Sequence, residues 1–290
     1  MIAVDLGQSG CRININGSIQ STSRGKLAGE SVISALEANF KNLSFQSETI
    51  TLSLTGLFGD VGDTKPFLTL CQEYFAAKEV AVIDDGLANL AGALAGKPGV
   101  SLTLGGGVVA VGGNGEKLSH SDGLGSHFGD EGGGFWLGSR GLTRALASRD
   151  KREINSELED IFINEIKLFD SLESKNGPEA SSLAISCAQK VLEIDSEVTN
   201  KIKQEGALRL AQTVISAWNK VGSTGETFNL TISGGLSKNE YYRELIFKNV
   251  KNLNTNVNLL TAVGDNLDGA IWIAQNWLQD IRPMLGWARA

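Results

Sequence analysis

Apolar, strand-like segments that end in glycine turns recur along this chain, and helix-like segments separate them. Residues 1–12, MIAVDLGQSGCR, form an apolar run that reaches Asp5 and then turns through Gly7, Gln8 and Ser9. Glycine accounts for 35 of the 290 residues, and glycines at strand ends let a backbone approach a ligand closely. Strands that alternate with helices predict an α/β fold, in which helices cover the sheets.

A hairpin of two apolar runs starts the chain and is repeated further along. Residues 2–6 and 11–15 predict the first hairpin, and residues 100–105 and 108–113 predict the second. The breaker GKPG at 96–99 lies between them and is the best candidate for a hinge. We therefore expect a duplicated unit, one copy on each side of this hinge.

The remaining elements follow from apolar periodicity. Helical spacing predicts a small-residue helix that ends before the hinge, several helices in the second half and a closing helix near the C-terminus. The expected helices cover 27–43, 66–77, 86–95, 238–250 and 265–282, with more within 130–221, and the expected strands cover 48–54, 79–83, 227–233 and 257–263.

Composition excludes several classes of protein. A content of 41% apolar and 20% charged residues is typical of a globular protein, and 290 residues suffice for one large domain or two ordinary ones. The net charge of −7 argues against non-specific binding to nucleic acid or to an anionic membrane. Cys11, Cys71 and Cys187 are widely separated, so we expect buried thiols rather than disulfides or a zinc site. Without a visible targeting segment, a reducing cytoplasm is the expected location.

Carboxylates stand at the ends of two of the predicted strands. Residues 82–91, VIDDGLANLA, place Asp84 and Asp85 where a strand should give way to a helix, and Asp5 precedes the first glycine turn. Backbone N–H groups in such a turn can bind phosphate oxygens, while carboxylates hold Mg²⁺ waters and orient a hydroxyl nucleophile. The pattern is what phosphoryl transfer requires, although the first turn alone fits a plain hairpin equally well.

Two further glycine turns strengthen the hypothesis of a nucleotide site. Gly105, Gly106 and Gly107 lie between the strands of the second hairpin, and Gly234 and Gly235 follow a strand and lead into a helix. A glycine turn before a helix is a common phosphate-binding arrangement, whereas a single glycine run can be only a flexible connection. Three such turns at three strand ends favour a nucleotide.

The densest glycine segment, residues 122–138, contains a pair of acids. Asp130 and Glu131 precede an apolar helix and could simply interact with its dipole. The alternative is a ligand site, in which paired carboxylates accept hydrogen bonds from sugar hydroxyls. His127 lies in the same segment, but a lone histidine is more often a structural hydrogen-bonding group, and we leave it out of the site.

These motifs together resemble a known superfamily. The sequence contains, in the expected order, DLGQS-x-x-R, DDGLANLAG, GGG, GDEG-x-x-FWLG and SGGLSKNEYY. They resemble the actin-like (sugar kinase/Hsp70/actin) ATPases, and most of all the branch that holds N-acetylglucosamine kinases and BadF/BadG-type ATPases. The resemblance runs from Asp5 to residues 269–274. It implies two duplicated ribonuclease H-like lobes with a central cleft: an N-terminal lobe over 1–95, which a C-terminal helix over 275–290 could complete, and a C-terminal lobe over 96–274.

The resemblance also implies roles for the loop residues. Residues 5–12, from Asp5 to Arg12, match the first phosphate motif, with Gln8 and Ser9 at the γ-phosphate and Asp5 near the magnesium, which it would hold directly or through water. Gly105, Gly106 and Gly107 match the second phosphate loop, and Gly234 and Gly235 match the adenosine motif. ATP and Mg²⁺ are thus the implied cofactors.

Asp85 matches the catalytic acid that faces the acceptor hydroxyl, and Asp130 and Glu131 match the pair that contacts the sugar. The chain departs from the family at Gly106 and Val108, where Thr and Ser are common, and at Leu124, where Trp is usual. These departures put N-acetylglucosamine itself in doubt more than they put sugar phosphorylation in doubt.

We therefore expect an ATP-dependent kinase that phosphorylates a hexosamine or related hexose, of the N-acetylglucosamine or glucosamine type, at the 6-hydroxyl. Its partners would be sugar and ATP, with neither nucleic acid nor membrane involved, and a homodimer is possible. Two alternatives stay open. One is a BadF/BadG-type ATPase without a sugar substrate, against which the scattered cysteines speak, since such an activator needs them for an interface cluster. The other is a non-catalytic sugar sensor on the same fold.

Overall fold

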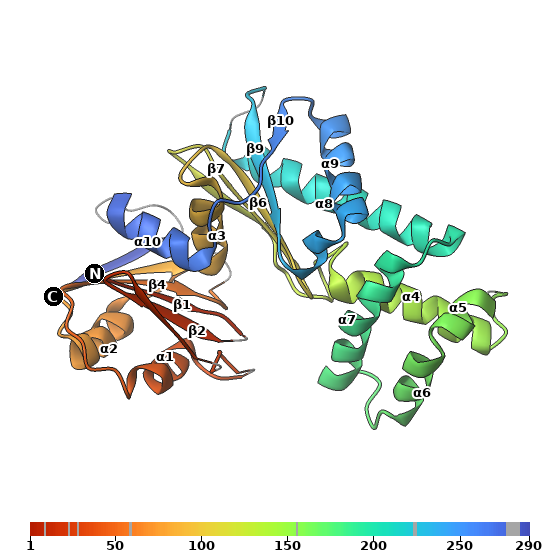
Figure 1. Cartoon of the computed structure of the whole chain (residues 1–290), viewed down its shortest axis with the longest axis horizontal. Coiled ribbons are helices and arrows are strands. Elements are labelled where there is room, and N and C mark those ends of the chain that lie inside the picture. Colours follow the sequence, from red (N-terminus) through yellow and green to blue (C-terminus); the bar gives the residue numbers. More distant parts are fainter. Residues whose placement is uncertain are drawn as a thin grey trace.

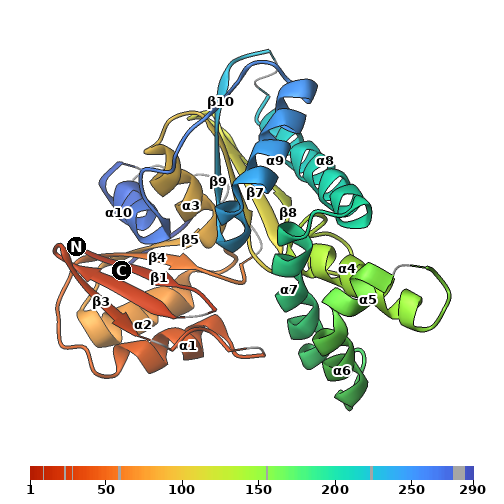
Figure 2. The ribbon, with the colours of Figure 1, turned by 45° about the vertical axis from the view of Figure 1, so that its right-hand side comes forward.

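The computed structural model of the protein describes residues 1–8, 10–22, 24–27, 29–57, 60–154, 156–222, 225–276 and 285–290. These residues form two mixed β-sheets with helices packed against them, which make the two lobes seen in Figure 1. Both chain termini lie at the first sheet in Figures 1 and 2. The α/β expectation is confirmed.

The first sheet has six strands in the order β11-β5-β4-β1-β2-β3. Its central strands β1, β4 and β5 are parallel to one another and almost wholly buried, which explains why they appear in the sequence as near-continuous apolar runs. The elements of this lobe are β1 (Ile2–Leu6), β2 (Cys11–Ile15), β3 (Ser18–Thr22), α1 (Val32–Phe40), β4 (Thr49–Leu54), α2 (Lys65–Phe75), β5 (Glu79–Asp84) and β11 (Leu285–Arg289).

The second sheet has five strands in the order β10-β9-β6-β7-β8, and most of the helices lie beside it. Its strands are β6 (Gly99–Leu104), β7 (Val108–Gly113), β8 (Leu118–Asp122), β9 (Phe228–Ser233) and β10 (Val257–Leu259). Its helices are α4 (Gly134–Arg149), α5 (Ser156–Ile161), α6 (Ile163–Ser171), α7 (Pro178–Glu193), α8 (Glu197–Lys220), the 3₁₀ helix η1 (Gly235–Lys238) and α9 (Glu240–Leu253).

The two sheets repeat one arrangement of strands. β1 pairs antiparallel with β2 and parallel with β4, and β6 pairs antiparallel with β7 and parallel with β9. The predicted duplication of a hairpin-first unit is therefore confirmed. All three cysteines are buried and free, as expected.

Two helices, α3 (Asp85–Leu94) and α10 (Asn266–Asn276), lie side by side between the sheets (Figure 2). Glycine makes their close contact possible, because a Cβ at Gly92 would lie 2.0 Å from the carbonyl oxygen of Asp265 and one at Gly269 would lie 1.8 Å from that of Ala88. The residues between α3 and β6 include Gly96, at φ +75°, which packs on Trp272 of α10. The predicted hinge thus lies where the two helices meet.

The expectation of a helix through the C-terminus is wrong for its last residues. α10 ends at Asn276, residues 277–284 lie outside the described part, and Leu285–Arg289 form strand β11. β11 pairs antiparallel with β5 and so covers an edge of the first sheet that would otherwise be unpaired. α10, expected in the second lobe, packs against α3, β1 and β4. The division of the chain into lobes by residue number stays a prediction. Strand β10 is also shorter than the expected 257–263.

No helix within the described ranges is long and apolar enough to cross a membrane.

Candidate active site

The first glycine turn joins β1 to β2, and ionic contacts hold its strand ends. The Gly7 N–H donates to the Gly10 carbonyl at 2.9 Å, which closes the turn. Asp5 is 8% exposed and accepts hydrogen bonds from Arg12 at 2.6 Å and from the Ser53 hydroxyl at 3.1 Å. Asp5 is therefore a fixed, ion-paired carboxylate near the end of β1. Ser9 lies outside the described residues.

Arg12 does more than pair with Asp5. Its second guanidinium nitrogen donates to Asp265 at 2.5 Å, just before α10 begins. Hydrogen bonding to Arg12 lowers the pKa of Asp265, although partial burial opposes this. Arg12 thus connects the first phosphate motif to the start of α10. The cofactor contact that the resemblance implies for Arg12 stays a prediction.

The two acids at the end of β5 have different environments. Asp84 is 2% exposed and caps α3, because its side chain accepts a hydrogen bond from the Gly86 N–H at 2.9 Å. Asp85 is the first residue of α3 and is only partly buried. Both acids line the cavity between the lobes, but Asp84 is nearly fully buried and engaged as the cap of α3, whereas Asp85 is the more exposed of the two.

The electrostatics of Asp85 suit a base. Burial, together with the nearby charges of Asp84 and Asp5, raises the pKa of Asp85 to about 7, although a hydrogen bond from Thr55 opposes the shift. A carboxylate with a pKa near the working pH is well matched to proton transfer.

The second glycine turn, between β6 and β7, is closed by a hydrogen bond from the Gly105 N–H to the Gly107 carbonyl at 2.9 Å. The first turn of α4 holds it from behind, because the N–H groups of Gly134 and Phe135 donate to the carbonyls of Gly105 and Gly106 at 2.9 Å. Neither the Gly106 nor the Gly107 N–H has a hydrogen-bond partner within the described ranges. These two amides are the donors that a phosphate group could use.

Asp130 braces the same turn. Its Oδ1 accepts a hydrogen bond from the Val108 N–H at 2.9 Å, and a Cβ at Gly107 would lie 2.6 Å from its Oδ2. Asp130 itself has φ +58°, and its N–H donates to Asp122 at 2.8 Å. Burial raises the pKa of Asp130. One role of this acid is therefore to fix the second glycine turn.

A neighbouring side chain accompanies the departure from the family at Gly106, where Thr is common. A Cβ there would lie 3.0 Å from the Cδ1 of Ile185 on α7. Ile185 therefore occupies the space that the larger side chain expected from the family would need.

One cavity of about 380 Å³ brings some of the predicted residues together from both lobes, whereas Asp5, Gly7, Arg12 and Gly106 are not in its lining. Gln8 and Asp85 come from the first lobe, and the second glycine turn and Asp130 from the second. The full lining is Gln8, Thr55, Gly56, Asp84, Asp85, Thr103, Gly105, Gly107, Val108, Val109, His120, Gly123, Gly125 and Asp130. Glu131 and Leu124 instead line a separate cavity of about 310 Å³, where Glu131 lies 3.8 Å from Arg209.

The predicted adenosine motif lies beside the second turn. Gly234 has φ +92°, and a Cβ there would lie 2.2 Å from the carbonyl oxygen of Leu104, the residue before Gly105. Only glycine meets both requirements. Gly235 lines a cavity of about 230 Å³ together with Gln189 and Leu192 of α7 and with residues around η1.

The acids fit a magnesium ion held largely through water. Within the described part of the chain, no cluster of three or more His, Cys, Asp or Glu side chains is arranged to ligate a metal. However, the charges of Asp5 and Asp84 act on Asp85 and raise its pKa, so a cation here would relieve repulsion. Mg²⁺ commonly keeps several waters and binds through one or two carboxylates plus substrate phosphates.

Three residues that lie at or near this cavity were not singled out from the sequence. His120 and Thr55 line it, and Lys26 packs against Gly56 and donates its N–H to the Gly7 carbonyl. A histidine in a short edge strand and a threonine after an apolar run carry no local signal of their own. Only the register of their strands places them at the cleft.

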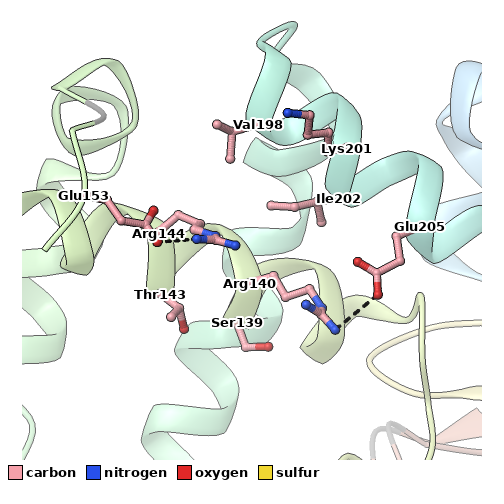
Figure 3. Close-up of a pocket in the computed structure, with 9 residues that line it drawn as sticks. All are labelled: Ser139, Arg140, Thr143, Arg144, Glu153, Val198, Lys201, Ile202 and Glu205. Atoms are coloured by element: carbon pink, nitrogen blue, oxygen red, sulfur yellow. Dashed lines mark hydrogen bonds and ion pairs between the residues drawn. The ribbon is translucent and has the colours of Figure 1, made fainter.

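A larger cavity of about 440 Å³ lies elsewhere, between α4 and α8 (Figure 3). Its cations Arg140, Arg144 and Lys201 pair with the carboxylates of Glu205, Glu153 and Glu197. Because each cation already has a partner, the cavity offers no excess charge to an anionic ligand. None of the predicted site residues lines it.

Comparison with known proteins shows similarity to sugar kinases in sequence and in fold. The chain is 27% identical over 208 residues to an N-acetylmuramic acid/N-acetylglucosamine kinase from Clostridium acetobutylicum, and the match covers 68% of each chain.

Two solved structures share the two-lobed fold. One is a proposed N-acetylglucosamine kinase from Porphyromonas gingivalis, with a TM-score of 0.65, 14% identity and coverage of 96% of this chain and 99% of that one. The other is a ROK family glucokinase from Streptomyces griseus in complex with glucose and AMPPNP, with a TM-score of 0.55, 16% identity and coverage of 94% and 97%.

A family model for the BadF/BadG/BcrA/BcrD ATPases matches residues 7–271, nearly the whole chain and all of the cavity that joins the lobes. This extent of agreement settles the family. The chain belongs to the BadF/BadG/BcrA/BcrD ATPase family.

Proposed function

We propose that the protein is an ATP-dependent kinase that phosphorylates a hexosamine or a related hexose, of the N-acetylglucosamine or glucosamine type, at the 6-hydroxyl. The observation that carries this proposal is the single cavity that holds Asp85 and both glycine-turn regions. The relative named as an N-acetylmuramic acid/N-acetylglucosamine kinase supports an amino sugar as the acceptor.

Asp85 would act as the general base. It would orient the acceptor hydroxyl and take its proton as the hydroxyl attacks the terminal phosphoryl group of ATP. The N–H groups of Gly106 and Gly107 would stabilise the charge on the transferring group, because they are already oriented and have no partner among the described residues.

Asp5 would hold magnesium through water, since both of its oxygens already accept hydrogen bonds from Arg12 and Ser53. The ion would neutralise charge on the nucleotide phosphates. The adenosine would lie toward Gly234 and Gly235, because Gly234 packs on Leu104 beside the second turn and Gly235 lines the 230 Å³ cavity next to α7.

Closure of the lobes about α3 and α10 would exclude water from the site. Without such exclusion, water could replace the sugar hydroxyl as the acceptor of the phosphoryl group. Asp130 and Glu131 were both expected to contact the sugar. Asp130 lines the cavity and is the better placed of the two, whereas Glu131 would reach a sugar only if closure moved its segment.

ADP formation measured with a panel of sugars tests the proposal. We expect ADP to form with ATP, Mg²⁺ and a hexosamine, and NMR of the product to place the phosphate on O6. ADP formation that does not depend on sugar would indicate an ATPase without a sugar substrate. Sugar binding without turnover would indicate a sensor. Either result contradicts the kinase proposal.

A cytoplasmic location and a homodimer are further parts of the proposal. Cell fractionation and light scattering of the purified protein test them.

A further inference from the structure

His120 lies on β8, the outermost strand of the second sheet, and points toward the cleft. Its neighbours Ser119 and Ser121 point the other way, where their hydroxyls donate to Ala217 at 2.6 Å and to Ser216 at 3.2 Å on α8. Side chains alternate between the two faces of a strand, so His120 faces the side opposite α8. It accordingly lines the cavity that contains Asp84 and Asp85.

The imidazole of His120 has hydrogen-bonding capacity to spare. In the part of the chain that the structure describes, neither ring nitrogen has a hydrogen-bond partner, although the backbone carbonyl of His120 accepts one from Lys220 at 2.9 Å. The ring is half-buried. A polar group that is half withdrawn from water and unpaired in a substrate cavity is well placed to bind a polar ligand group.

The ring is expected to be neutral near pH 7. Burial lowers the pKa of His120, and the charge of Lys220 lowers it further, while Asp84 and Asp122 oppose the shift. A neutral imidazole carries one donor and one acceptor. It can therefore bond to either a hydroxyl or an amide of a sugar.

A small residue and an apolar side chain form the wall of the cavity around His120. Gly123, at φ +74°, comes close to the imidazole, since a Cβ there would lie 3.1 Å from His120 Cε1. Val109, on the neighbouring strand, adds an apolar surface to the same cavity. One apolar side chain, one small residue and one neutral imidazole would suit a ring with a polar substituent.

We propose that His120 positions the acceptor sugar through a hydrogen bond to one hydroxyl or amide substituent of its ring, and so helps to determine which sugar is phosphorylated. This inference rests on the proposed kinase function. It assigns His120 to sugar binding and not to proton transfer, which remains with Asp85.

Steady-state kinetics of three variants test the assignment. His120→Ala should raise the sugar KM about tenfold and leave the ATP KM unchanged, because the sugar substituent would lose its hydrogen-bond partner in the cavity. His120→Gln, which keeps a donor and an acceptor, should recover part of the loss. His127→Ala is the matched control, because His127 is exposed and does not line the cavity. A sugar KM in His120→Ala within about twofold of wild type would overturn the proposal.

Deoxy sugars locate the contact. The sugar that lacks the contacted substituent should be a poorer substrate for the wild type by about tenfold, yet no poorer than the parent sugar for His120→Ala. A purely structural role would leave the ranking of these sugars unchanged in the variant. An unchanged ranking would therefore also overturn the proposal.

NMR of the imidazole groups separates this inference from the kinase proposal. The chain has only 2 histidines, so the His127→Ala variant identifies both ring signals. Addition of the sugar panel to the wild type should shift the His120 signal and not the His127 signal. A shift without phosphorylation would sustain the inference and contradict the kinase function. Phosphorylation without a shift would do the reverse, and the absence of both would overturn both.

Discussion

The two glycine turns of this protein share a backbone design and differ in what stabilises them. Each is closed by an N–H···O=C hydrogen bond of 2.9 Å across the turn, from Gly7 to Gly10 and from Gly105 to Gly107. Each follows the first strand of its sheet and lies between the two strands of an antiparallel hairpin.

The side chains at equivalent positions have diverged. Asp5 faces Arg12 across its hairpin and Ser53 on the parallel strand. The equivalent Thr103 faces Val109 and Ser233. The first turn is thus stabilised by the ion pair of Asp5 and Arg12 at its strand ends. The second turn is stabilised by hydrogen bonds with Asp130 and with the first turn of α4. The two copies of the unit thus carry a side-chain ion pair at one turn and, at the other, backbone N–H groups without a hydrogen-bond partner among the described residues.

The largest expected effect is a loss of turnover on replacement of Asp85, which we assign to the general base. Asp85→Asn should lower kcat by roughly 10²–10⁴-fold, the usual range for a general base, and change the sugar KM far less, because Asn keeps a hydrogen-bonding group in place. Single-turnover kinetics would measure the chemical step directly. Asp84→Asn separates the two acids: it should lower stability, since Asp84 caps α3, and lower the pKa of Asp85 by removing a neighbouring charge. Near-native turnover in Asp85→Asn would move the base to another residue.

Much of this site follows from local sequence, and some of it does not. Glycine turns and acids at strand ends are local patterns, so Asp5, Asp85 and the three glycine motifs could be predicted. The hydrogen bond from the Val108 N–H to Asp130 joins residues that are 22 positions apart in the sequence. The bond from Arg12 to Asp265 joins residues that are 253 positions apart. No periodicity indicates such contacts.

The same limit explains the errors in the fold. The apolar pattern predicted a helix over 265–282, and the family resemblance implied that a helix over 275–290 could complete the first lobe. A sequence pattern does not reveal that β5 has a free edge, which offers backbone partners to Leu285–Arg289. The orientation of His120 likewise depends on which face of β8 is packed against α8.

A second test removes the charge pair of the first turn. Arg12→Ala would leave the buried carboxylate of Asp5 without its cation, at a cost of about 1–3 kcal/mol because Arg12 itself is partly exposed. We expect a lower unfolding temperature and a higher ATP KM. Arg12→Lys keeps the charge but not the two-pronged geometry, so it should recover part of the loss. Unchanged ATP affinity would show that the first turn needs no ionic support.

The pH dependence of catalysis should reflect Asp85. Its pKa is raised to about 7, and the base must be ionised to accept a proton, so kcat/KM for the sugar should fall about tenfold per pH unit below that value. Magnesium and nucleotide would favour the ionised form, which should move the midpoint for kcat to lower pH. Profiles of both parameters between pH 5 and 9 check this. The residual activity of Asp85→Asn should lack the slope, and a wild-type profile flat down to pH 5 would contradict the assignment.

The smallest expected effect compares the two turns at one equivalent position. Ser53 and Ser233 occupy the same place in the two sheets, opposite Asp5 and Thr103 respectively. The Ser53 hydroxyl donates to Asp5, whereas the buried hydroxyl of Ser233 has no hydrogen-bond partner among the described residues. Ser53→Ala should therefore lower the free energy of unfolding by about 1–2 kcal/mol, and Ser233→Ala should leave it unchanged or raise it slightly. Urea denaturation of both variants measures the difference. Equal losses of unfolding free energy would mean that Ser53 and Ser233 contribute equally to stability. The contrast between the ion-paired first turn and the second turn would then fail at this position.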